Sequence, residues 1–395
     1  MIEDQKSGSK LLRRMNIFQW AVLTLVILLG FGIRIYDLKE PPLDFHPVRQ
    51  LRSALIARSV YYQINPDVSA EIKQQAYDLA NLEVYEPPIF EYLVGGTYYL
   101  LGSEKLWISR IFLALFWSIG GIALFALCRR YASYYSALLG LAFYLFLPFG
   151  VIASRSFQPE PWMVMWILLT AFALYNWAEA RTWKWALMVG LFGGMAVLVK
   201  VVAAVFVVGM VASVSIATLG LKNLYRSAKL WVMAILILAP TILFYLIFHQ
   251  GRSSSFFSFW FGSLSWLVAT TEFYADWLAM IKVLMGLAVF MLAILGFLLS
   301  SRKAKPLLLG GWVGYVIYGL IFPYQYVTHE YYHLPLVALV AVSVPPLLDG
   351  FINKFKEQHW VWRGLAIGVF LFASGYSLYV ARSIMYASDY KYEPL

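Results

Sequence analysis

The sequence predicts an all-α polytopic membrane protein, with about eleven transmembrane helices near the ~20 residues that a bilayer requires. Hydrophobic residues make up 61% of the 395 residues, charged residues only 13%, and the mean hydropathy is +0.69. Soluble domains carry roughly a quarter of charged residues, and a soluble fold of this length has too small an interior for so much apolar surface. The apolar residues form continuous runs, whereas transmembrane strands alternate apolar and polar residues, so we expect helices.

The expected spans follow the apolar runs in chain order. These runs are 17–35, 107–128, 135–152, 162–178, 185–199, 201–219, 230–248, 278–299, 306–322, 334–349 and 364–381. Basic residues precede the first run, as in a signal peptide, but the run is too long for one and no A-x-A site follows, so we expect an uncleaved span. We expect residues 1–395 to form a single membrane domain with no soluble C-terminal domain.

The basic residues predict the orientation of these spans. With the N-terminus inside, the internal segments are 1–16, 129–134, 179–184, 220–229, 300–305 and 350–363. They hold 17 of the 31 lysines and arginines but only five acidic residues, counting Asp349 beside the last segment. This positive-inside pattern accounts for the whole net charge of +10 and leaves no support for a nucleic-acid partner. It predicts a multi-pass protein of the plasma (inner) membrane with a cytoplasmic N-terminus.

The first outer loop, residues 36–106, is expected to form helices along the membrane surface. Pro41-Pro42-Leu43-Asp44 reads as extended chain that stops at a helix start, with Asp44 or a near neighbour able to cap the helix. Apolar residues then recur on one helical face, at Val48, Leu51, Leu55 and Tyr62. Arg49 and Arg52 lie off that face and are expected to be free for an anion.

A second surface helix is expected over residues 89–102, after the chain is broken again at Glu86-Pro87-Pro88. The alternative is that both surface helices only anchor the loop to lipid and carry no chemistry.

Three charged residues stand where charge is costly. Arg155 and Glu160 lie in the outer turn between the third and fourth spans, and Lys200 lies at the outer end of the fifth. Ionisable residues at membrane depth are candidates for function. The alternative for Lys200 is that its ammonium group snorkels to the interface.

Several short motifs follow one another in an order typical of one enzyme family. They are Asp44-Phe45-His46-Pro47-Val48-Arg49-Gln50, Ala57-Arg58, Glu86-Pro87-Pro88, Ser109-Arg110, Ser154-Arg155-Ser156-Phe157-Gln158-Pro159-Glu160-Pro161, Leu198-Val199-Lys200 and His329-Glu330-Tyr331-Tyr332. Over roughly residues 15–345, this series resembles the bacterial protein-mannosyltransferase-like and aminoarabinose-transferase-like enzymes. These are polytopic glycosyltransferases of the GT-C superfamily.

The resemblance implies a reaction at the outer, periplasmic face. A sugar, either a hexose or a pentose, would move from a polyprenyl-phosphate carrier to a hydroxyl group of a protein, a lipid or a glycan. The family has an essential acid in its first outer loop, and Asp44 stands at the matching position. Many members place a second acid directly after the first, whereas Phe45 and His46 follow here.

The chemistry of such a transfer assigns roles to the expected residues. A carboxylate takes the proton of the acceptor hydroxyl, and Asp44 and Glu160 are the expected catalytic acids. Cations and hydrogen-bond donors hold the lipid phosphate at the membrane boundary. The expected substrate-binding residues are His46, Arg49, Arg52, Glu86, Arg155, Lys200, His329, Tyr331 and Tyr332. The spacing leaves open a divalent metal ion held by Asp44, Glu160 and His46.

Two other functions fit parts of the pattern. His329-Glu330-Tyr331-Tyr332-His333 matches H-E-x-x-H, which binds zinc in proteases when both histidines share a helical face. Pro335 is expected to open the next span and Leu334 to depart from the α conformation, so the motif would be non-helical. Asp349, the third ligand of such proteases, would lie roughly 24 Å further along that span. A transporter or flippase would also use charges near the midplane.

Overall fold

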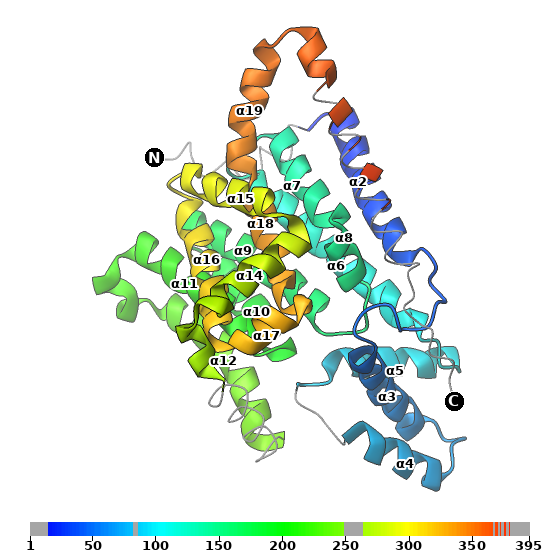
Figure 1. Cartoon of the computed structure of the whole chain (residues 1–395). Helices are drawn as coiled ribbons and strands as arrows, with labels where there is room; N and C mark the ends of the chain where they lie inside the picture. Colours follow the sequence, from blue (N-terminus) through cyan, green and yellow to red (C-terminus); the bar gives the residue numbers. More distant parts are fainter. Residues whose placement is uncertain are drawn as a thin grey trace.

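The computed structural model describes residues 15–81, 86–248 and 264–365, together with 368–369, 372, 375–376 and 379. All regular elements in this described part are helices (Figure 1). The first half holds α2 (Ile17–Ile35), α3 (Pro47–Ile64), α4 (Ala70–Asn81), α5 (Ile89–Leu101), α6 (Trp107–Cys128), α7 (Tyr134–Phe146), α8 (Pro148–Ala153), α9 (Glu160–Ala180), α10 (Trp183–Val199), α11 (Ala203–Leu219), the 3-10 helix η2 (Leu221–Arg226) and α12 (Ala228–Phe248). The second half holds η4 (Ser265–Ala269), α14 (Thr271–Met285), α15 (Leu287–Leu299), α16 (Lys305–Ile321), α17 (Pro323–Thr328), η5 (Glu330–His333), α18 (Leu334–Ser343) and α19 (Pro345–Glu357).

The described helices make this a multi-pass membrane protein. Five candidate spans are long and apolar enough to cross a bilayer, and α14 with α15 adds a sixth if the bent pair counts as one span. Four shorter apolar helices, α7, α10, α11 and α16, have between 10 and 17 residues. Ten of the expected apolar runs lie on helices, and the run 364–381 falls largely outside the described residues.

Two of the expected spans are not continuous helices. The prediction of one helix over 278–299 is wrong, because the chain bends by 96° between α14 and α15. Gly286 lies at the bend with a φ of +81°, a conformation that glycine adopts without a steric penalty. The run 135–152 is interrupted just before Pro148, whereas the run 334–349 lies within the single candidate span Glu330–Phe355, with a local break at Val344 before Pro345. A proline lacks the N–H group that would continue the helical hydrogen bonding.

Helix α9 lies at the centre of the bundle and is buried over most of its length. It packs against α6, α10 and α11, while α2 and α12 are largely exposed, as helices that face lipid. Helices α3, α4 and α5 lie beyond the end of the bundle, next to the start of α6 and the end of α2 (Figure 1). The expectation that residues 36–106 form helices is confirmed for the described part of this segment.

Helix α3 carries both an exposed apolar face and a buried face. The helix packs on α5, and its buried residues are mostly small or polar, with one isoleucine and one tyrosine: Gln50, Ser53, Ala54, Ile56, Ala57, Ser59 and Tyr61. The expected apolar face is exposed, with Val48 at 82%, as a surface in contact with lipid would be. The capping role considered for Asp44 is wrong, because His46 holds the N-cap position and no side chain caps the helix.

Candidate active site

The turn between α8 and α9, residues 154–159, lies at the centre of the charged residues and is buried throughout. Pro159 precedes α9 and Pro161 lies in its first turn, where a proline fits because its N–H would have no helical partner. Arg155 at the start of the turn and Glu160 just after it enter two different clusters of charged side chains.

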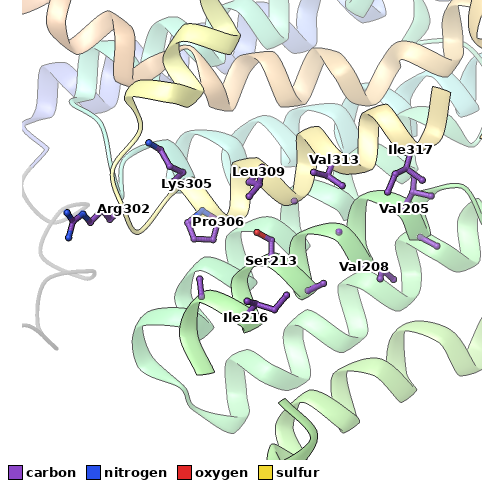
Figure 2. A pocket seen from close by; sticks show the side chains of 15 residues that line it. Val205, Val208, Ser213, Ile216, Arg302, Lys305, Pro306, Leu309, Val313 and Ile317 are labelled. Carbon is purple, nitrogen blue, oxygen red and sulfur yellow. The ribbon is translucent and has the colours of Figure 1, made fainter. Parts of the chain in front are cut away.

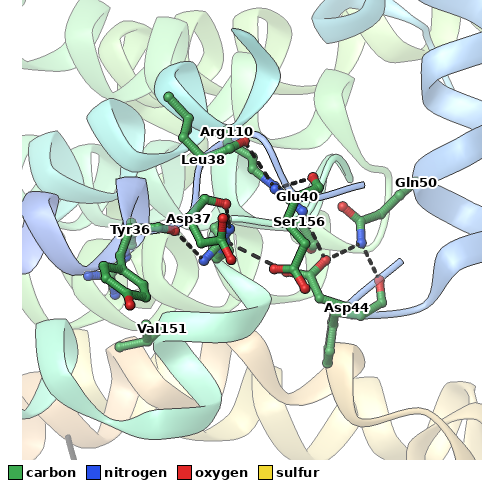
Figure 3. Close-up of polar contacts among 12 residues, drawn as sticks. Tyr36, Asp37, Leu38, Glu40, Asp44, Gln50, Arg110, Val151 and Ser156 are labelled. Atoms are coloured by element: carbon green, nitrogen blue, oxygen red, sulfur yellow. Dashed lines mark hydrogen bonds and ion pairs between the residues drawn. The ribbon is translucent and has the colours of Figure 1, made fainter. Parts of the chain in front are cut away.

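Asp44, Gln50, Arg110 and Arg155 form the first of these, which we call the Asp44 cluster (Figure 3). Asp44 Oδ1 accepts hydrogen bonds from Gln50 Nε2 at 3.0 Å and from Arg110 Nη2 at 3.3 Å. Asp44 Oδ2 lies 3.6 Å from Arg155 Nε and accepts no hydrogen bond from the described residues. One oxygen of the carboxylate is therefore fixed by two hydrogen bonds, and the other accepts none from the described residues.

The other contacts of this cluster fix the backbone on both sides of Asp44. Arg110 donates hydrogen bonds to the carbonyl oxygens of Leu38, Glu40 and Pro41. Arg155 donates to the carbonyl oxygens of Tyr36 and Asp37. Gln50 donates to Phe45 O at 2.8 Å, and its Oε1 accepts from Phe157 N at 2.9 Å. Buried arginine and glutamine side chains therefore join the loop that carries Asp44 to the turn before α9.

The second cluster, the Lys200 cluster, consists of Arg49, Glu86, Glu160 and Lys200 beneath Tyr331 and Tyr332. Lys200 Nζ lies 3.0 Å from Glu86 Oε1 and also contacts Glu160 Oε1. Arg49 Nη2 lies 3.1 Å from Glu160 Oε1 and 3.5 Å from Glu86 Oε2. Two cations and two carboxylates thus compensate one another.

This pairing corrects two expectations. Arg49 is not free for an anion, because it already pairs with both glutamates. Lys200 does not snorkel, because it is only 3% exposed and its ammonium group is held inside the cluster. Arg155, expected beside Lys200 at the lipid phosphate, makes its hydrogen bonds and its ion pair in the Asp44 cluster.

The electrostatics of the Lys200 cluster favour charged side chains. Burial raises the pKa of Glu86, but Lys200 and Arg49 outweigh burial and hold that pKa below its ordinary value. Burial and Arg49 lower the pKa of Lys200, but Glu160 and Glu86 outweigh them and the pKa lies above its ordinary value. Both groups are therefore ionised at neutral pH.

Two tyrosines form a wall over these cations. The ring centroid of Tyr331 lies 4.6 Å from Arg49 Cζ and 5.6 Å from Lys200 Nζ, and that of Tyr332 lies 5.4 Å from Lys200 Nζ. These distances suit cation–π attraction.

His46 and His329 lie beside this wall. His46 Nε2 is 3.1 Å from Glu330 Oε1, and its ring meets that of Tyr331 edge-on at 4.7 Å. The ring of His329 stacks 6.1 Å from that of His46, and burial together with His46 lowers the pKa of His329. Since His46 follows Asp44 by two residues, this contact connects the Asp44 loop with the Lys200 cluster.

Each cluster contains a buried carboxylate oxygen without a hydrogen bond from the described residues, Asp44 Oδ2 and Glu160 Oε2. Buried acceptors are usually satisfied, so such atoms call for an explanation. Each is an acceptor that a further hydrogen-bond donor would satisfy.

Arg52 and Glu91 line a polar cavity of about 30 Å³ beside the Lys200 cluster, which is room for a water molecule. Ser53 Oγ donates to Glu91 Oε1 at 2.8 Å, and burial raises the pKa of Glu91 to about 7.

The H-E-x-x-H motif does not have the geometry of a protease zinc site. His329 is extended and Glu330–His333 is a 3-10 helix, so the motif does not form the α-helix that would put both histidines on one face, as expected. Leu334 has the α conformation, so the expectation that it departs from that conformation is wrong. Both ring nitrogens of His333 are engaged, Nδ1 with the Tyr315 hydroxyl at 2.9 Å and Nε2 with Tyr326 O at 2.7 Å.

The expected third ligand, Asp349, accepts hydrogen bonds from Ser133 and Ser136 at the start of α7. Across the described ranges, no three His, Cys, Asp or Glu side chains gather as metal ligands. Asp44, Glu160 and His46, the set considered for a metal ion, each contact a different partner: Arg110, Lys200 and Glu330.

The sequence reasoning assigned no role to Gln50, Arg110 or Arg34. Arg34 is fully buried near the end of α2, where it donates to Ser154 Oγ at 2.6 Å. Arg34 and Arg110 each interrupt an apolar run, and a charge at membrane depth is a signal that could have identified them. Gln50 carries no such signal.

Residues 85–245 match the family of dolichyl-phosphate-mannose-protein mannosyltransferases. The matched range includes Glu86, Arg110, Arg155, Glu160 and Lys200, whereas Asp44, Arg49 and the two tyrosines lie outside it. Comparison with curated proteins gives no match. The match confirms the expected resemblance: over residues 85–245 the chain is similar to the dolichyl-phosphate-mannose-protein mannosyltransferases, a family of membrane glycosyltransferases.

Proposed function

We propose that the chain transfers a sugar from a polyprenyl phosphate to a hydroxyl group of a protein, lipid or glycan on the outer face of the plasma membrane. The observation that carries this proposal is the pairing of two sites across one buried turn. One site is a pair of cations under two tyrosines, and the other is a buried carboxylate with one unused oxygen.

The Lys200 cluster is the proposed site for the donor phosphate. Phosphate oxygens would accept the hydrogen bonds of Lys200 and Arg49 that Glu86 and Glu160 accept in the structure. The same two cations would stabilise the negative charge that develops on the phosphate as the bond to the anomeric carbon breaks.

Asp44 is the proposed general base. The acceptor hydroxyl would donate to Asp44 Oδ2, lose its proton to that oxygen and attack the anomeric carbon, while the carrier phosphate leaves with the bonding electrons. Arg110, Arg155 and Gln50 hold the carboxylate in place. Glu86 suits this role less well, because its pKa is lowered and its oxygens are already paired. Glu83 lies outside the described residues.

The orientation is part of the proposal. About eleven spans with a cytoplasmic N-terminus would place the two clusters at the outer face, because they lie at the ends of α2, α10 and α16 opposite to the basic segments 179–184 and 300–305.

The Asp44→Asn variant tests the base. Asn keeps the size of the side chain and one acceptor oxygen but cannot take the proton, so turnover of labelled polyprenyl-phosphate sugar should fall by about 10²–10⁴-fold. The affinity for the carrier lipid should stay nearly the same, and its measurement also shows that the variant is folded.

Asp67→Asn is the matched control, since Asp67 is an exposed acid of the same segment. It should transfer sugar at the normal rate. If Asp44→Asn also transfers at a near-normal rate, Asp44 serves only to pair with Arg110 and Arg155, and the base lies elsewhere.

A further inference from the structure

A long apolar groove runs between α11 and α16, away from both charge clusters (Figure 2). Its volume is about 940 Å³, at the upper end for pockets that bind small molecules. Along α11 it extends from Ala204 to Ala217, which is ~20 Å of helix at 1.5 Å per residue. The lining side chains are half exposed, and the groove therefore opens toward lipid.

The shape of the groove follows from small residues. Gly209 on α11 lies against Gly310 on α16, where an added Cβ would come within 2.6 Å of the Gly310 carbonyl oxygen. The helices therefore cross at backbone contact. Ala204, Ala212 and Ala217 add no bulk on the outer side of this crossing, so a channel remains beside it.

The two ends of the groove differ in charge. Ala204 lies near Lys200 and the clusters, but this end of the groove is lined by apolar side chains. The opposite end is lined by Arg302 and Lys305, which Figure 2 shows together at one end of the two helices. An apolar channel that ends at two exposed cations is complementary to a lipid with an acyl chain and an anionic headgroup.

We propose that this groove binds an anionic membrane phospholipid, with its headgroup at Arg302 and Lys305 and an acyl chain along α11 and α16. Basic pockets between transmembrane helices are known binding sites for anionic lipid heads. The groove is longer than half of the ~30 Å hydrocarbon core, so it accommodates a chain of one leaflet. The headgroup then lies in the leaflet opposite to the Asp44 and Lys200 clusters.

The proposal does not depend on the proposed function. A donor lipid would place its phosphate at Lys200, the other end of the groove. The competing occupant is therefore the polyprenyl tail of the donor. The experiment separates the phospholipid from the polyprenyl phosphate by comparing their headgroups and the effects of substitutions at the cationic end and in the middle of the groove.

The test uses the purified full chain in detergent and native mass spectrometry. Phosphatidylglycerol and phosphatidylcholine with identical acyl chains are titrated, and a polyprenyl phosphate is titrated in parallel. Phosphatidylglycerol should bind more tightly than phosphatidylcholine. Arg302→Gln and Lys305→Gln should each reduce phosphatidylglycerol affinity by about five-fold, which corresponds to one juxtamembrane cation. Ala212→Trp, which fills the groove, should weaken both phospholipids.

Lys303→Gln is the matched control, because Lys303 lies between the two cations in sequence and does not line the groove. It should bind phosphatidylglycerol like the parent chain. Equal affinities for the two phospholipids would overturn the proposal, as would an equal loss in the Lys303→Gln control. Loss of polyprenyl phosphate alone in Ala212→Trp would also overturn it and would assign the groove to the donor tail.

Discussion

At the scale of single residues, Lys200 and Glu160 depend on each other. Both are buried, and each compensates the charge of the other in a place with little solvent. Removing one partner of such a pair typically destabilises a protein by about 3–5 kcal/mol, because the remaining charge is left uncompensated. A loss of function in a single variant would therefore not distinguish a binding role from a structural one.

The pair of variants Lys200→Met and Lys200→Met/Glu160→Gln makes this distinction. The double variant removes the uncompensated charge, so thermal stability in detergent should recover much of what the single variant loses. Affinity for polyprenyl phosphate should stay ~1.5–3 kcal/mol weaker in both, the worth of a charge-assisted hydrogen bond.

Lys184→Met serves as a control, because Lys184 is exposed at the other end of α10. Full recovery of carrier binding in the double variant would mean that Lys200 only neutralises Glu160.

At the scale of helices, Glu91 makes the docking of α5 against α3 dependent on pH. Burial raises its pKa from 4.5 to about 7, and Ser53 on α3 donates to it. Between these pH values the folded chain keeps a proton that the undocked chain has released. The docking is therefore strongest below pH 4.5 and weakens as the pH rises through 7, by at most ~3 kcal/mol.

Hydrogen exchange of α3 and α5 amides between pH 5 and pH 8, corrected for intrinsic rates, measures this effect. Protection should fall with rising pH in the parent chain and stay flat in Glu91→Gln. The control Glu71→Gln, on the exposed face of α4, should follow the parent chain. A flat parent profile would contradict the raised pKa.

The crossing of α11 and α16 leaves no room for a side chain. A Cβ at Gly314 would lie 2.7 Å from Val205 O and 2.8 Å from Phe206 Cα, both backbone atoms that cannot move independently. Gly314→Ala should therefore lower the free energy of unfolding by about 1–3 kcal/mol.

Gly350→Ala, at a helical position with open space around it, should be neutral or stabilising by roughly 0.5–1 kcal/mol. Thermal unfolding of both variants in the same detergent compares them. Equal melting temperatures would show that the two helices can separate at no cost.

The helices themselves were largely predictable from the sequence, because lipid requires long apolar runs and these runs are visible without tertiary information. The break at Gly286 was not, since a glycine within an apolar run is compatible with a straight helix as well as with a bend. The fit of α3 on α5 was also missed, because most of the buried residues of α3 are small or polar and do not form an apolar stripe.

The residues of the two clusters were singled out from the sequence except for Gln50 and Arg110, whereas none of their contacts was predicted. Glu160 and Lys200 are 40 positions apart, and nothing in that spacing indicates an ion pair. Arg155 binds carbonyl oxygens of residues 36 and 37, and backbone acceptors leave no mark in a sequence. A charged residue within an apolar run can be recognised as one that needs a partner, but the sequence does not show which residue that partner is.

At the scale of the whole molecule, the orientation in the membrane decides where the reaction occurs. Lys73→Cys on α4 should react with a membrane-impermeant thiol reagent added outside intact cells, whereas Lys303→Cys between α15 and α16 should not. The single native cysteine, Cys128, is buried and should give little background. The reverse pattern would move both clusters to the cytoplasmic face.

The balanced charge of the Lys200 cluster bears on which phosphates the site selects. Two cations and two carboxylates leave no net charge, so beyond a Debye length of about 8 Å the cluster exerts little pull on a soluble anion. A phosphate on a membrane-embedded tail reaches the site at high effective concentration without any long-range field. Inorganic phosphate and soluble nucleotide sugars are therefore expected to be poor competitors, and the site selects its ligand by anchorage rather than by attraction.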